Sequence, residues 1–128
     1  MAKMAEQLKI QVADEVGKLA EITKALKDAE VNVIAANAWL RQGQGFMYLV
    51  TDDADKASNA LDPVVDSCQT GGQVVCVNVP NMPGALNNVA AKLADAGIAI
   101  NVCYATTAGG EAMIVLDTSD NAKAAGLV

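Results

Sequence analysis

Apolar and polar residues alternate in two short stretches that lie sixty-seven positions apart. Leu8, Ile10 and Val12 form the first stretch, and residues 75–79 repeat its pattern. A period of two is typical of a half-buried strand. Each stretch is followed by apolar residues spaced as on one face of a helix, over residues 16–29 and 86–96. The pattern therefore predicts a strand and then an amphipathic helix, twice.

A hairpin follows each expected helix. Glycine-bearing connections at residues 43–45 and 108–110 are short enough to join antiparallel neighbours. The expected strand pairs are 31–40 with 46–51 in the first copy, and 98–107 with 112–117 in the second.

A short helix is expected at the end of each copy, and it begins after the capping residues at 52–53 and 118–120. The first copy can add a weak last strand at 64–68, before the Gly-Gly pair, whereas the second copy ends with no room for one. The order predicts an α+β protein of two ferredoxin-like (βαββαβ) domains, 1–70 and 71–128. Each is expected to have an antiparallel sheet with its helices on one face.

The two halves match in register. Gly17 matches Gly84 at an offset of sixty-seven, and Met47 is expected to match Met113 after a one-residue gap in the hairpin loop. An internal repeat of this length indicates a duplicated small domain. A binding site is therefore expected to draw on both copies.

The expected third strands, 46–50 and 112–116, are apolar on both faces. A strand of this kind needs cover on both sides, and the helices supply only one. Either the sheet leaves an apolar face partly exposed, or a second copy of the chain covers it. We favour the second explanation, which predicts a homodimer or larger homo-oligomer.

Composition and charge exclude several classes of protein. The 128 residues are 52% hydrophobic and carry a net charge of −6, which argues against binding nucleic acid. No apolar run approaches the ~20 residues of a membrane span, and the amino terminus lacks the apolar core of a signal peptide. We therefore expect a cytoplasmic protein.

Candidate catalytic and metal-binding residues are few. The chain has no histidine, and its three cysteines (Cys68, Cys76 and Cys103) show no C-x-x-C spacing. The acidic run 52–55 does not have the spacing of a calcium-binding loop. We therefore expect neither an enzyme nor a bound metal or cofactor.

The loop before the second copy's helix carries a recognisable motif, Asn81-Met82-Pro83-Gly84-Ala85-Leu86. With a helix that ends in Leu93-Ala94-Asp95-Ala96-Gly97-Ile98, it resembles the ACT domain. The first copy keeps Gly17 and Leu19 but has Asp14-Glu15-Val16 in place of Asn-x-Pro. Since both copies match in register, the chain resembles a protein of two ACT domains.

That resemblance implies a regulatory role. ACT domains pair side by side and bind amino acids at their shared interface. The chain would then be an amino-acid-binding regulatory protein that acts on an enzyme or regulator in trans. The alternative is an assembly module that has kept the fold and lost the ligand.

The resemblance also implies where a ligand would bind, if the two domains pair within the chain. A helix start suits a carboxylate, and the Asn side chains of the loop and of the second strand would hold the polar groups of an amino acid. The stronger predicted site consists of Asn81, Met82, Pro83, Gly84, Ala85, Leu86, Asn32 and Val33. A weaker site, with extra negative charge, consists of Asp14, Glu15, Val16, Gly17 and Ala99.

Overall fold

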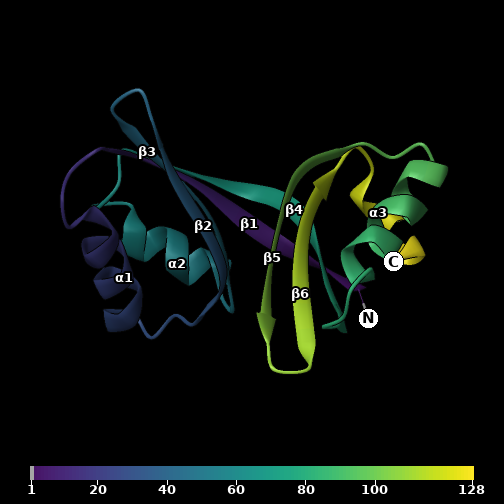
Figure 1. Cartoon of the computed structure of the whole chain (residues 1–128). Helices are drawn as coiled ribbons and strands as arrows, with labels where there is room; N and C mark the ends of the chain where they lie inside the picture. The colour runs from purple at the N-terminus through teal and green to yellow at the C-terminus, as the bar shows by residue number, and fades with distance from the viewer. Residues whose placement is uncertain (1) are drawn as a thin grey trace. The chain divides into compact units, whose positions relative to one another are not determined.

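A computed structural model describes residues 2–128 and shows the order β-α-β-β-α twice (Figure 1). The two copies are thus α+β repeats with antiparallel strands, which confirms the predicted order of elements. The elements are β1 (Ala2–Ala13), α1 (Lys18–Asp28), β2 (Val33–Arg41), β3 (Gln44–Thr51), α2 (Ala54–Leu61), β4 (Ser67–Pro80), α3 (Ala85–Asp95), β5 (Ile100–Ala108), β6 (Glu111–Thr118) and α4 (Asn121–Leu127).

The chain divides into two compact units. The first unit is Glu6–Gly72, and the second joins the start of the chain, through Ala5, to Gln73–Val128. The strands follow the order β2-β3-β1-β4 in the first unit and β1-β4-β6-β5 in the second. The start of the chain therefore supplies the strand that the second copy was expected to lack.

The strand β4 is longer than the sequence pattern indicated. The prediction of a weak strand at 64–68, ending before Gly71-Gly72, was wrong. The strand β4 begins at Ser67 and continues through both glycines to Pro80. Gly71 has a φ of 81°, a conformation that costs glycine little. Its N–H donates to the Glu6 carboxylate (2.8 Å), so the strand continues where a break was expected.

The repeat keeps one offset throughout. Ile10 pairs with Met47 in the first unit, and Val77 pairs with Ile114 in the second. Met47 therefore corresponds to Ile114, and its expected match with Met113 across a one-residue gap was wrong. A slip of one residue would turn every side chain of the strand to the opposite face of the sheet.

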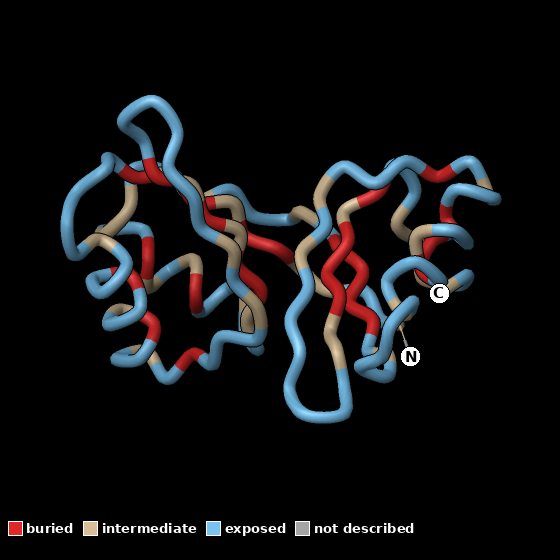
Figure 2. Tube along the Cα trace, viewed as in Figure 1, coloured by how far each residue is buried: buried red, intermediate tan, exposed pale blue. Residues whose placement is uncertain are grey.

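Each unit has its own hydrophobic core, formed where both of its helices pack on one face of its sheet (Figure 2). The predicted one-sided arrangement of the helices is confirmed. In the first unit the most deeply buried core residues are Leu8, Leu26, Leu49, Ala57 and Leu61; in the second they are Val75, Leu93, Ile114, Leu116 and Ala124.

The third strands are also buried on the face away from the helices. Val50 and Val115 are each 1% exposed, and their neighbours in sequence point into the cores. On this face of the first unit, Trp39 stacks on Phe46 (5.6 Å between ring centroids) and meets Tyr48 edge-on at 4.9 Å. Part of the cover expected from a second chain is therefore already present, and the homo-oligomer stays a prediction.

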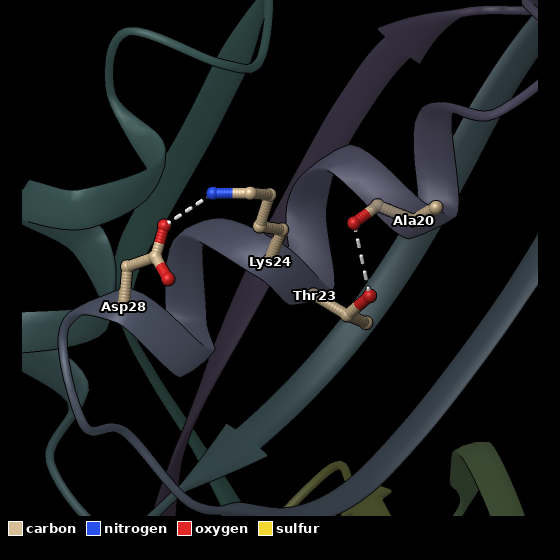
Figure 3. A network of polar contacts seen from close by, with 4 residues as sticks. All are labelled: Ala20, Thr23, Lys24 and Asp28. Atoms are coloured by element: carbon tan, nitrogen blue, oxygen red, sulfur yellow. Dashed lines mark hydrogen bonds and ion pairs between the residues drawn. The ribbon is translucent and has the colours of Figure 1, made fainter.

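Hydrogen bonds along α1 do little to hold this helix in place. Figure 3 shows Lys24 bound to Asp28 at 2.7 Å and the Thr23 hydroxyl donating to the Ala20 carbonyl at 3.2 Å. The hydrogen bond from Lys24, followed by its charge, lowers the pKa of Asp28. Because this ion pair is fully exposed, solvent screens it. The helix is instead anchored through its buried face.

The two units differ at the end of the third strand. The Thr118 hydroxyl donates to the Asn121 side chain (2.8 Å), which in turn donates to the Gln73 carbonyl (2.8 Å). Ala54 stands where the first unit would need that asparagine. The buried Thr51 hydroxyl consequently has no hydrogen-bond partner among the described residues.

We expect the two threonines to respond differently to the loss of the hydroxyl. Thr51→Val removes an unpaired buried group, so the free energy of unfolding should stay constant or rise by up to about 1 kcal/mol. Thr118→Val breaks the hydrogen bond to Asn121 and should lower the free energy of unfolding by about 1–3 kcal/mol. Urea unfolding followed by circular dichroism measures both, and equal losses would contradict this account.

Candidate functional site

The loop between the first strand and the first helix has the same turn in both units. Gly17 and Gly84 occupy the N-cap positions with φ values of 87° and 90°, where a Cβ would strain the backbone. In the first unit the Lys18 N–H donates to the Glu15 carbonyl at 3.2 Å, and the second unit repeats this bond. No side chain caps either helix, so the N–H groups of the first turn are directed toward the loop.

The loop is fastened to the neighbouring hairpin turn. In the second unit the Asn81 side chain donates to the Gly109 carbonyl (3.0 Å), and its backbone N–H donates to Gly110 (2.9 Å). In the first unit only the backbone bond recurs, from Asp14 to Gly43 at 3.2 Å. An ionised carboxylate cannot donate, so the Asp14 side chain cannot make the second bond.

A cavity lies beside this loop in each unit. The first has a volume of about 320 Å³ and the second of about 190 Å³. The first cavity is lined by Val12, Ala13, Asp14, Glu15, Gly17, Lys18, Leu19, Ile22, Ala38, Trp39, Leu40, Gly45, Phe46 and Met47. The second is lined by Val79, Pro80, Asn81, Met82, Ala85, Leu86, Ala105, Thr106, Thr107, Ala112 and Ile114.

The two cavities are the same feature of the fold. Every residue that lines the second cavity stands sixty-seven positions after one that lines the first. Two copies of a domain that differ widely in sequence have therefore both kept a hollow between the loop, the first helix and the hairpin. Concave sites with an apolar lining are where small molecules bind, typically in volumes of about 300–1,000 Å³.

The structure brings some of the residues predicted for a site together. Asp14, Glu15 and Gly17 line the first cavity, and Asn81, Met82, Ala85 and Leu86 line the second. Val16, Pro83, Gly84 and Ala99 line neither cavity.

Asn32 and Val33 lie elsewhere in the first unit. The backbone N–H of Asn32 donates to the Asp52 carboxylate at 3.0 Å, and the Asp52 N–H returns a bond to the Asn32 carbonyl at 3.1 Å. Neither Asn32 nor Val33 lines the first cavity. A site that joins Asn81 with Asn32 therefore needs residues of both units and stays a prediction.

Sequence reasoning missed the side of the cavity formed by the hairpin. Trp39, Leu40, Gly45 and Met47 line the first cavity, although about twenty or more residues separate them from the loop. The available signal was the Trp39-Leu40 pair, two large apolar residues next to a turn. Leu40 is 65% exposed, which an ordinary strand end does not require.

The side chains offer little for covalent or metal chemistry. Burial raises the pKa of the Cys68, Cys76 and Cys103 thiols, so they stay protonated and weakly nucleophilic at neutral pH. Within residues 2–128, no group of three or more His, Cys, Asp or Glu side chains is placed to hold a metal ion.

No helix within residues 2–128 is both long and apolar enough to cross a membrane.

The chain, with its repeated β-α-β-β-α units, belongs to the ACT domain family. The family model for an ACT domain pair matches residues 3–128. A comparison with curated protein sequences found no match.

Several solved structures share the fold. Protein BT0572 from Bacteroides thetaiotaomicron aligns with a TM-score of 0.89 at 28% identity, over 98% of this chain and 87% of that one. The ligand-free regulatory subunit of aspartate kinase from Thermus thermophilus gives 0.75 at 17% identity, over 99% and 92%. The corresponding subunit from Thermus flavus gives 0.72 at 17% identity, over 99% and 90%. The chain is thus an ACT domain pair, and its fold resembles that of these regulatory subunits.

The bond from Asn81 to the hairpin turn can be tested by exchanging residues between the copies. Asn81→Asp removes the donor to Gly109 and should lower the free energy of unfolding by about 1–2 kcal/mol. The reverse exchange, Asp14→Asn, removes no such bond and should change it by less than about 0.5 kcal/mol. Chemical denaturation of both variants measures the difference, and a loss of equal size in Asp14→Asn would show that the hydrogen bond is not the cause.

Proposed function

We propose that this chain is an amino-acid-binding regulatory protein. The observation that carries the proposal is the cavity that recurs at matched positions in both ACT domains, beside an uncapped helix start. A helix start favours a carboxylate, and a cavity with an apolar lining can accommodate an amino-acid side chain.

We further propose that the protein acts on a separate enzyme of amino-acid metabolism. Two of the structures that share its fold are regulatory subunits of aspartate kinase, and the alignment spans nearly all of both chains. The raised thiol pKa values and the absence of a metal-binding cluster within residues 2–128 favour a regulatory role over a catalytic one. Binding of the amino acid would then change the affinity of the chain for its partner.

A thermal-shift panel of the twenty amino acids tests the proposal. A ligand present at a hundred times its Kd should raise the free energy of unfolding by about 2.7 kcal/mol, which increases the melting temperature by several degrees. We expect a small group of chemically related amino acids to produce this shift. A flat panel at millimolar concentrations would favour an assembly module without a ligand.

Calorimetry separates two assignments of the site. If Asn81 and Asn32 together hold the ligand, as predicted from the sequence, Asn81→Ala and Asn32→Ala should each weaken binding by about 1–3 kcal/mol. If the ligand instead occupies the larger cavity of the first unit, both variants should bind as the parent protein does. The cavity volumes favour the second outcome.

A further inference from the structure

The first cavity has an apolar wall that continues to its mouth. Leu19 and Leu40 are 56% and 65% exposed, yet both line the cavity. Ile22 and Met47, which belong to the core, close its inner end. Large apolar side chains gathered around a hollow mark a binding surface rather than chance exposure. The wall therefore suits an apolar group that enters from solvent.

Three charged residues line the same cavity, and they are of both signs. Asp14 and Glu15 come from the loop, and Lys18 begins α1. The Lys18 ammonium is 3.3 Å from a Glu21 carboxylate oxygen, a single contact for a group that has three donors. Two carboxylates beside an ammonium and a helix start match the ammonium and the carboxylate of a free α-amino acid.

The second unit acts as an internal control, because the same positions carry other residues. The three charged residues become Asn81, Met82 and Ala85, none of which is charged. Leu40 becomes Thr107, which shortens the apolar wall.

The walls of the two cavities also differ by one methyl group. A Cβ added to Gly45 would come within 2.9 Å of the Val12 side chain and within 3.8 Å of the Leu40 side chain. Ala112, the counterpart of Gly45, carries that methyl group in the smaller cavity. Gly45 thus packs closely against Val12, where the second unit carries the methyl group of Ala112.

We propose that the first cavity binds an α-amino acid with an apolar side chain, and that the second cavity does not bind this ligand. The inference rests on the proposed function and narrows it to a ligand class and to one of the two sites. The side chain of the ligand packs against Leu40 and Leu19. Its ammonium lies at Asp14 and Glu15, and its carboxylate lies at Lys18 and the start of α1.

Calorimetry on the full chain tests the ligand class directly. We expect at least one of leucine, isoleucine, methionine and phenylalanine to bind about tenfold or more tightly than lysine, aspartate and threonine, because the apolar wall discriminates by such factors. The leucine analogue 4-methylpentanoate, which lacks the ammonium, should bind at least about tenfold more weakly than leucine, since it leaves Asp14 and Glu15 without a partner.

Variants that copy the second unit into the first test the site. Leu40→Thr reproduces Thr107, and Asp14→Asn reproduces Asn81; each should weaken binding of the apolar amino acid by about tenfold or more. Leu40 is largely exposed, so its replacement leaves the core intact, which circular dichroism verifies. The matched control is Leu86→Thr at the second cavity, where a 48% exposed leucine changes in the same way and affinity should stay within about twofold.

The outcomes separate this inference from the proposed function. If apolar amino acids bind, and Leu40→Thr weakens this binding while Leu86→Thr does not, both the inference and the proposed function are supported. Tight binding of a polar amino acid, or an equal loss in the two leucine variants, overturns the inference and leaves amino-acid sensing standing. No binding of any of the twenty amino acids overturns both.

Discussion

The antiparallel pairing between the first and third strands of each unit determines where everything else in the fold lies. Ala13 opposite Gln44, and Pro80 opposite Glu111, place the end of the first strand beside the hairpin turn. The loop that follows is then bonded to that turn through its backbone. Because side chains alternate along a strand, the same register decides which residues enter the core and which line the cavity.

The two copies have kept aliphatic cores but differ in charge at the loop before the first helix. Both fill the space under the sheet with aliphatic side chains and with a fully buried alanine from the last helix, Ala57 or Ala124. At the loop, the charged residues of the first copy correspond to neutral residues at the equivalent positions of the second copy. Large buried residues are constrained by packing from several elements at once, whereas loop residues are free to change with the ligand. The neutral loop of the second copy is consistent with the proposal that only the first copy binds the ligand.

The helix start supplies polar groups at the cavity without any side-chain cap. Gly17 and Gly84 allow the chain to turn into the helix with a positive φ. The first N–H of each helix donates to a loop carbonyl, and no side chain caps the N–H groups that follow. At the last helix of each unit, by contrast, Asp53 and Asp120 accept bonds from the first turn and complete it internally. The last helix of each unit thus has an aspartate cap on its first turn, whereas the first helix of each unit has no side-chain cap at the cavity.

The sequence by itself determined the order of elements, the duplication and the family. Strand alternation at Leu8, Ile10 and Val12 and the helical spacing that follows are local patterns, and each can be read without knowing its neighbours. The motif at Asn81–Leu86 likewise lies within one loop and the start of one helix. Only the tertiary structure decided that β4 continues through its glycines, that the start of the chain completes the second unit, and that Leu40 and Gly45 lie beside the loop at the first cavity. These features depend on pairing between strands far apart in the chain, and no local pattern specifies that register, because the pairing is set by how the whole sheet buries its apolar face.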